Sequence, residues 1–192
     1  MNYDFFAYMA RMKYIRRWCL MHSVTDENIM EHTQQVTVIA HALAVIGNKY
    51  YGKNYDVEKV LLLSTYHECS EVITGDLPTP IKYFNEDIKV AYKNLENLAC
   101  EKILSTLPDE LRGEYANFVI PDASSQEYLI MKRADRIAAY LKCVEELKAG
   151  NKEFKKAKDS IGKELFAATE EEVRFFLKNV LPVYSKTLDE LE

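Results

Sequence analysis

Glycine, proline and cysteine are scarce in this chain of 192 residues, which contains 6, 5 and 4 of them. Few segments alternate with period two, so the sequence argues against a protein built from short strands and tight turns. The cysteines are widely spread and form no C-x-x-C pair; they are Cys19, Cys69, Cys100 and Cys143. We therefore expect reduced thiols in a cytoplasmic protein and no disulfide framework.

An excess of positive charge and long apolar runs are lacking as well. The formal net charge of −5 argues against a general nucleic-acid or membrane-surface binder, because such proteins are usually basic. The longest apolar run, from Val36 to Gly47, is interrupted by Thr37 and His41 and is too short to span a bilayer. The first four residues, M-N-Y-D, lack the features of a signal peptide. We expect neither a membrane partner nor a nucleic-acid partner.

The chain does have the apolar periodicity of helices, with 48% hydrophobic and 29% charged residues, as in a folded globular protein. We expect a single all-α domain over residues 1–192. The expected helices cover about residues 4–13, 29–49, 57–74, 85–107, 109–118 and 126–149, with a last helix from about residue 170 that Pro182 bends or interrupts. Asn54 or Asp56 is a suitable cap for the third helix, and residues 124–127 and 169–172 resemble capping boxes.

The most informative stretch is Y-H-E-C-S-E at residues 66–71, directly after an apolar run. On a continuous helix, at about 100° per residue, Glu71 lies roughly 40° and Glu68 roughly 100° from His67, so the three share one shoulder. An imidazole and two carboxylates at the end of a buried helix are costly without partners, which makes them the start of a divalent-metal site. The stretch is not the H-E-x-x-H motif of metalloproteases, because Glu71 stands where the second histidine belongs.

Further ligands must come from other helices. His32 lies near the start of the second helix, and His41, nine residues later, points to the opposite face, so both cannot serve one site. We expect His41 to be a packed or surface histidine. Asp135 lies inside the fifth helix, where spacing alone favours an ion pair with Lys132 or Arg136, worth at most about 0.5 kcal/mol.

The order His32, His67-Glu68, Asp135 matches the H…HD…D pattern of the HD-domain metal-dependent phosphohydrolases, with Glu68 where that family has Asp. Over nearly the whole chain, the sequence resembles the bacterial HD-domain 5'-deoxynucleotidases (YfbR-like). The resemblance rests on R-W at 17–18, E-H at 31–32, Y-H-E-C-S-E at 66–71, T-G-D-L-P-T-P-I-K-Y-F at 74–84, K-R-A-D at 132–135 and Y-L-K-C-V-E-E-L-K-A-G-N at 140–151. The T-G-D-L-P-T-P loop and the last block make it specific.

The resemblance implies an HD-domain helical bundle that hydrolyses deoxyribonucleoside 5'-monophosphates to deoxynucleosides and phosphate with a metal-activated water. It implies one divalent cation, held by His32, His67, Glu68 and Asp135. Imidazole with carboxylate suits Mn, Co, Fe or Zn better than Mg. By matching position, Glu71 is the catalytic group that takes the proton from the attacking water.

The resemblance also implies the substrate contacts and a homodimer. Arg17 orients the phosphate as a planar bidentate donor. Trp18 packs against the sugar and leaves no room for a 2'-hydroxyl. The residues expected to contact the sugar hydroxyl and nucleotide are Asp76, Leu77, Pro78 and Thr79. Without the resemblance, Arg17 is a solvated charge, Trp18 a core residue and Asp76 a turn former.

Glu68 departs from the family pattern, because its extra methylene carries the carboxylate about 1.5 Å further from the backbone. It either ligates still, ligates with altered metal preference, or swings aside and leaves a weak site; we expect retained ligation. Three alternatives stay open. The chain is an HD-fold phosphohydrolase for a ribonucleotide or a nucleoside polyphosphate, a nucleotide-binding protein with turnover weakened by Glu68, or a helical interaction protein without a site. The apolar residues between Val173 and Tyr184 suit a core or a dimer surface.

Overall fold

The computed structural model describes residues 2–191, and the predicted all-α fold is confirmed in that range. The α-helices are α1 (Asp4–Arg11), α2 (Ile29–Tyr50), α3 (Val57–Tyr66), α4 (Glu71–Thr74), α5 (Thr79–Lys82), α6 (Glu86–Leu104), α7 (Asp109–Val119), α8 (Gln126–Lys148), α9 (Lys155–Phe166) and α10 (Glu171–Asn179). Short 3₁₀ segments cover Met12–Tyr14, Lys152–Phe154, Leu181–Ser185 and Leu188–Glu190. None of the described helices has the length and hydropathy needed to cross a bilayer. Both ends of the predicted domain, residues 1 and 192, lie outside the described residues.

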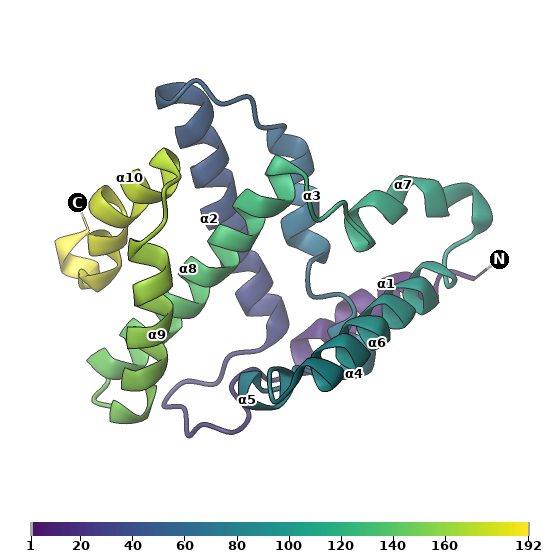
Figure 1. The fold of residues 1–192 in the computed structure, drawn as a ribbon, viewed down its shortest axis with the longest axis horizontal. Helices are drawn as coiled ribbons and strands as arrows, with labels where there is room; N and C mark the ends of the chain where they lie inside the picture. The colour runs from purple at the N-terminus through teal and green to yellow at the C-terminus, as the bar shows by residue number, and fades with distance from the viewer. Residues whose placement is uncertain (1, 192) are drawn as a thin grey trace.

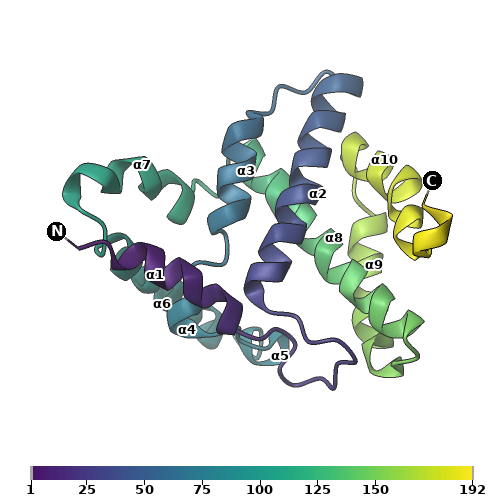
Figure 2. The same cartoon turned by 180° about the vertical axis from the view of Figure 1, so that it is seen from behind.

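Helices α2, α3 and α8 form the centre of the molecule, with α2 packed extensively against both of the others (Figure 1). Helices α9 and α10 pack against α8 and α2 at the end of the molecule that carries the C-terminus. At the opposite end, α1 lies against α6 (Figure 2). The chain therefore has a central helical layer with a group of helices at either side.

Two apolar clusters make up the core. The first joins α2, α8, α9 and α10 through buried residues that include Leu43, Ile137, Leu165 and Phe176. The second lies around α1, α6 and α7 and consists of Phe5, Cys69, Ile103, Leu104, Leu107 and Val119. Cys69 belongs to the turn after α3, so this turn lies where the second cluster meets the central helices.

Two helix starts agree with the sequence. The Asn28 side chain accepts hydrogen bonds from the backbone N–H groups of Met30 and Glu31, and the Glu31 carboxylate accepts from the Asn28 N–H. This capping box fixes the first turn of α2, directly before His32. Asp56 caps α3, as one of the two expected candidates, by accepting from the Lys59 N–H.

The third expected helix is interrupted. Helix α3 ends at Tyr66, residues 67–70 form a turn, and α4 begins at Glu71. The Ser64 carbonyl lies 2.7 Å from Nδ1 of His67, so this side chain bonds a carbonyl that a continuing helix would offer to a backbone N–H. The angles expected for one continuous helix are therefore wrong for this segment.

Both expected capping boxes are wrong. Helix α8 is capped by Ser125, whose hydroxyl accepts from the Tyr128 N–H, while Glu127 pairs with Lys59 of α3. Helix α10 starts after Glu170, with no side-chain cap. Both expected glutamates bind side chains from other parts of the chain: Glu127 binds Lys59, and Glu172 binds the hydroxyl of Tyr55. Spacing along the sequence cannot reveal such long-range partners.

Two segments that were not expected to be helical contain helices. Helix α9 has no counterpart among the expected elements, because its apolar face is narrow and Gly162 lies within it. The T-G-D-L-P-T-P segment, expected as a loop, ends in the one-turn helix α5, whose first turn accommodates Pro80 because proline has no N–H to lose there. The fourth helix ends three residues early, at Leu104.

Candidate active site

Four residues that the sequence singles out as metal ligands lie together at the centre of the molecule. His32 comes from the first turn of α2, His67 and Glu68 from the turn after α3, and Asp135 from the middle of α8. One potential ligand atom from each lies within 4.8 Å of the other three. The imidazole rings of His32 and His67 are 5.6 Å apart between centroids. Helices remote in sequence thus bring two imidazoles and two carboxylates to one point.

His67 turns one ring nitrogen, Nε2, toward this cluster. Its Nδ1 lies 2.7 Å from the Ser64 carbonyl oxygen, which can only accept, so Nδ1 carries the proton and donates it. In the neutral ring Nε2 is then unprotonated. Nε2 is buried, lies 3.2 Å from the nearest oxygen of Glu68, and makes no hydrogen bond of acceptable geometry. A buried lone pair without a donor is what a metal ligand offers before the ion is bound.

Asp135 is held by two partners. Its Oδ1 lies 3.0 Å from Nε2 of His32, and its Oδ2 is 2.5 Å from Nζ of Lys132. The pair with Lys132 confirms one of the two ion pairs expected from spacing, whereas Arg136 pairs with Glu164. Burial opposes the charge on Asp135, but Lys132 and His32 outweigh it and lower the pKa of its carboxyl. Asp135 therefore stays ionised.

The donor set fits a divalent transition metal. Around a tetrahedral ion, donors about 2.1 Å from the metal lie roughly 3.4 Å from one another, so ligand atoms up to 4.8 Å apart would move together by about 1.4 Å at most. The Glu68 carboxylate is one of the four converging groups, so its longer side chain has not swung away from the cluster. The unpaired Nε2 of His67 and the ionised Asp135 complete a site with the right chemistry.

Glu71 lies one turn beyond this cluster as the first residue of α4, and its side chain is buried. Its Oε2 has no hydrogen-bond partner. Burial, followed by the negative charges of Glu68 and Asp76, raises the pKa of Glu71 to about 11. A cation at the neighbouring carboxylates would oppose this shift, because it cancels the charges that favour the protonated form.

Arg17 reaches the same region from the segment between α1 and α2. Its side chain is only 13% exposed, so it is not the solvated charge that composition alone suggests. Although burial opposes it, the carboxylates of Glu27, Asp135, Glu68 and Asp76 together raise the pKa of its guanidinium. Arg17 therefore faces the acidic cluster as a permanent positive charge.

Trp18 is held beside Arg17 in an unusual backbone conformation. Its φ of 59° lies in the left-handed region, the only such value among the described residues other than glycine. Its indole Nε1 donates to the Glu27 carboxylate at 3.1 Å, and its ring lies 5.3 Å from that of the buried Phe154. A tryptophan is kept in a strained conformation only when its surroundings determine it.

The loop after α4 approaches this segment through Asp76. Burial raises the pKa of the Asp76 carboxyl, while the charge of Arg17 and a hydrogen bond from the backbone N–H of Trp18 oppose the shift. Gly75 has a φ of 72°, which a residue with a side chain rarely adopts, and its carbonyl accepts from the Tyr92 hydroxyl at 3.3 Å. The remaining predicted contact residues are half-buried, Leu77 and Pro78, or exposed, Thr79.

Glu27 was missed from the sequence, and the pair of Lys132 with Asp135 was expected only at the surface. Glu27 binds both Arg17 and Trp18, and Lys132 binds Asp135. A buried arginine demands a counter-charge, but no spacing rule shows that Glu27, ten residues away, supplies it. Lys132 was visible as a neighbour of Asp135 by helical spacing, although only as a surface ion pair.

Comparison with known proteins identifies the family. A sequence model described as 5'-deoxynucleotidase YfbR-like matches residues 4–184. The chain belongs to the YfbR-like 5'-deoxynucleotidase family. The 5'-deoxynucleotidase of Vibrio cholerae serotype O1 is 50% identical to it over 188 residues, which cover 97% of each chain. The resemblance found in the sequence motifs is confirmed.

Solved structures at lower identity share the fold of this YfbR-like protein. An HD-domain phosphohydrolase from Listeria innocua is similar with a TM-score of 0.83 and 20% identity, covering 94% of this chain and 88% of its own. The cyanophage S-2L HD phosphohydrolase DatZ, solved with dA and one catalytic Zn²⁺ ion, has a TM-score of 0.62 and 16% identity, covering 92% and 95%. The predicted HD-domain architecture is confirmed.

Proposed function

We propose that this protein is a metal-dependent phosphomonoesterase that hydrolyses deoxyribonucleoside 5'-monophosphates to deoxynucleosides and phosphate. The observation that carries the proposal is the convergence of His32, His67, Glu68 and Asp135 in a chain of the YfbR-like family. The relative from Vibrio cholerae bears the name 5'-deoxynucleotidase at 50% identity over almost its full length.

His32, His67, Glu68 and Asp135 would hold one divalent cation. When bound there, a cation lowers the pKa of a coordinated water and polarises a phosphate oxygen. A donor set of two imidazoles and two carboxylates favours Co, Mn, Fe or Zn. The Ser64 carbonyl keeps Nδ1 of His67 protonated, so the ring offers only Nε2 to the site.

The remaining roles follow from charge and burial. Arg17 offers planar N–H donors to the phosphate oxygens, and its burial strengthens that attraction. Glu71, whose Oε2 is unpaired, is the base that accepts the proton of the attacking water. Trp18 covers the sugar and excludes a 2'-hydroxyl, and the loop from Asp76 to Thr79 contacts the sugar and the nucleotide.

The deciding experiment is a phosphate-release assay. Purified protein is stripped of metal, reloaded separately with Mn, Co, Zn or Mg, and given matched deoxyribo- and ribonucleoside 5'-monophosphates. We expect release from the deoxyribonucleotides with at least one transition metal. No release with any metal would contradict the proposal, and equal rates on both sugars would contradict the role of Trp18.

The alternative is an HD-fold phosphohydrolase for another nucleotide, or a nucleotide-binding protein with turnover weakened by Glu68. The position of the Glu68 carboxylate within the cluster argues against lost ligation. Glu68→Asp restores the family residue and separates the two cases: higher turnover or metal affinity in this variant would favour the weakened enzyme. We expect lower metal affinity, because a shorter side chain withdraws its carboxylate from the cluster.

Four finer points belong to the same proposal. The native metal is one of Co, Mn, Fe or Zn, the protein acts in the cytoplasm, it forms a homodimer, and residues 1–192 constitute one HD-type domain. The cytoplasmic location rests on the wide spacing of the four cysteines in the sequence, without a C-x-x-C pair. Metal analysis of the purified protein and sedimentation velocity test the metal and the dimer.

A further inference from the structure

A single carboxylate oxygen joins the two residues that are expected to recognise phosphate and sugar. Oε2 of Glu27 accepts from Nη1 of Arg17 at 2.5 Å and from Nε1 of Trp18 at 3.1 Å. The guanidinium carbon of Arg17 lies 5.6 Å from the centre of the Trp18 ring. Because both donors meet at one atom, the guanidinium and the indole cannot move independently while Glu27 is in place.

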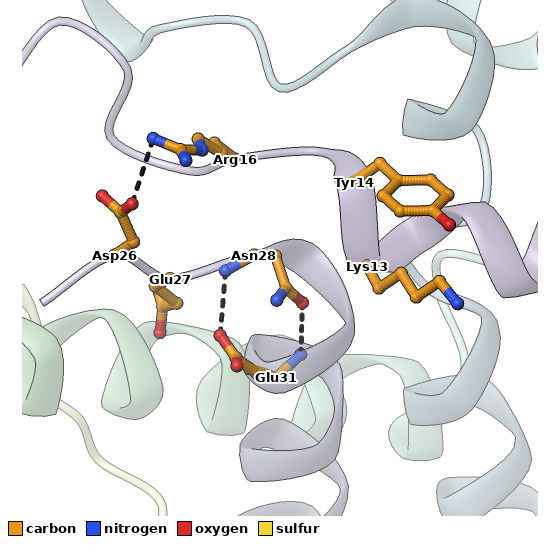
Figure 3. A pocket seen from close by; sticks show the side chains of 7 residues that line it. All are labelled: Lys13, Tyr14, Arg16, Asp26, Glu27, Asn28 and Glu31. Carbon is orange, nitrogen blue, oxygen red and sulfur yellow. Dashed lines mark hydrogen bonds and ion pairs between the residues drawn. The ribbon is translucent and has the colours of Figure 1, made fainter.

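The backbone brings Glu27 to this position. The N–H of Arg17 donates to the Glu27 carbonyl at 2.9 Å, and Arg16 and Asn28 form an isolated antiparallel bridge. The Glu27 side chain is 11% exposed. The residue before it, Asp26, pairs instead with Arg16 on the surface, and Figure 3 shows Glu27 pointing away from that pair. The side chain of Asp26 is therefore exposed, whereas that of its neighbour Glu27 is largely buried.

A surface pocket of about 310 Å³ lies beside the segment that contains Arg16 and Glu27. Its lining contains none of the four clustered residues and consists of Lys13, Tyr14, Arg16, Asp26, Glu27, Asn28 and Glu31 (Figure 3). Solvent therefore reaches the back of the Arg17 segment. Glu27 is one of the residues that line this hollow, and its carboxylate also binds Arg17 and Trp18.

We propose that Glu27 is a positioning residue that sets both phosphate binding and the choice between deoxyribose and ribose. The inference rests on the proposed function. Arg17 has five N–H donors, so one can bond Glu27 while others remain for a phosphate. Trp18, strained at φ 59°, needs an external contact to keep its ring in place, and the bond to Glu27 supplies it.

The test compares Glu27→Gln with Asp26→Asn. Both variants remove one negative charge, at adjacent residues, and neither changes side-chain size. In Glu27→Gln we expect KM for a deoxyribonucleotide to rise at least tenfold and the preference for deoxyribose over ribose to fall at least tenfold. In Asp26→Asn we expect both values to stay within twofold of wild type, because the ion pair of Asp26 with Arg16 is exposed.

Two further variants show whether the effects are linked. Arg17→Lys is expected to raise KM without changing the sugar preference, and Trp18→Phe to reduce the preference with little change in phosphate binding. Only Glu27→Gln should change both. A residue with a merely structural role would lower stability and leave the ratio of deoxyribo- to ribonucleotide turnover unchanged, so that result would overturn the proposal.

A second readout does not depend on turnover. Trp18 is the only tryptophan of the chain, so its fluorescence reports this site alone. We expect acrylamide to quench the emission of Glu27→Gln at least twice as efficiently as that of wild type, with a shift to longer wavelength. Unchanged quenching would overturn the proposal. If the wild type released no phosphate, the proposed function would fail while this measurement still decided the role of Glu27. Should Glu27→Gln not fold, Glu27→Asp, which retains the charge but withdraws it, is measured in the same way.

Discussion

The two ring nitrogens of His67 have different partners, and this difference prepares the residue for its proposed task. The Ser64 carbonyl binds the protonated Nδ1, while Nε2 is buried without a hydrogen bond. Burial disfavours the imidazolium, but the negative charge of Glu68 outweighs it and raises the pKa of His67. A cation and a proton therefore compete for the same nitrogen.

This competition predicts that His67 is essential for metal binding. We expect His67→Gln to weaken the binding of Mn or Zn at least tenfold, because loss even of a group that only supports a ligand costs about 10–100-fold. The matched control is His41→Gln, since His41 is exposed on the opposite face of α2. Metal binding is measured by equilibrium dialysis. Equal affinities of both variants would remove His67 from the site.

Glu71 is the residue for which metal binding and turnover should separate. We expect Glu71→Gln to lower kcat by at least about 100-fold, the smaller end of the range for losing a general base. Its metal content should stay that of the wild type, because Glu71 is not among the four converging residues. Phosphate release and elemental analysis are measured on the same preparation. Loss of the metal would instead make Glu71 a ligand.

At the scale of elements, the end of α8 anchors the segment that carries Arg17 and Trp18. The buried Glu146 accepts from the backbone N–H groups of Val24 and Thr25 and from Lys142. The Asn151 side chain completes the anchor by donating to the His22 carbonyl. The motif at residues 140–151, which made the family resemblance specific, thus holds the loop around Val24, more than 100 residues away in sequence.

The stability that Glu146 contributes should decrease as the pH falls. Burial opposes the charge of Glu146, but Lys142 and the backbone donors outweigh it and lower its pKa from 4.5 to about 2. A lowered pKa contributes stability above pH 4.5, and the contribution is lost as the pH falls toward 2. Glu146→Gln should therefore cost about 3 kcal/mol at pH 7, because it leaves Lys142 unpaired, and less at pH 3.

Urea unfolding at pH 7 and pH 3 measures this difference. The control is Glu145→Gln, because Glu145 is the exposed neighbour of Glu146 on the same helix. We expect the control to change the free energy of unfolding by less than about 0.5 kcal/mol at both pH values. A loss at Glu146 that is as large at pH 3 as at pH 7 would rule out the charged anchor.

Local rules predicted the elements that local contacts determine. Asp56 caps α3 through a bond three residues away, and the bounds of α2 follow from its capping box and apolar face. The break after Tyr66 was missed because it comes from a side chain bonding a carbonyl of its own helix. Glu27 was missed because an isolated bridge between two irregular segments brings it to Arg17, and such pairing has no periodicity.

The residues of the candidate site were predicted from the family resemblance and not from local spacing. The resemblance supplied the four clustered residues, which helical spacing alone would have left as one doublet and unrelated single residues. Spacing could not show that His32 and Asp135 approach to 3.0 Å, because they are 103 residues apart. Packing of α2 against α8 decides that distance, and it is a property of the whole core.

At the scale of the whole molecule, the site connects all three central helices. Its members come from α2, from the turn after α3, and from α8, which pack against one another. The turn also contributes Cys69 to the second apolar cluster. A cation bound there would cross-link the centre of the fold and stabilise the native state over the unfolded chain.

Metal binding should consequently raise thermal stability. At a metal concentration 100 times the dissociation constant, we expect about 2.7 kcal/mol of added stability. For a chain of this size that corresponds to a rise in Tm of roughly 5–10 °C. Calorimetry with and without Mn or Zn measures the shift, and Asp135→Asn should abolish it. A rise of the same size in that variant would place the metal elsewhere.

The separation of 103 residues between His32 and Asp135 also sets the order in which the nascent chain acquires its site. A ribosome that adds about 5–20 residues per second needs roughly 5–20 s to pass from one to the other. His32 is made first in that interval, and His67 and Glu68 follow, all before the aspartate that completes the set. The four-residue set is therefore complete only once α8 has been synthesised.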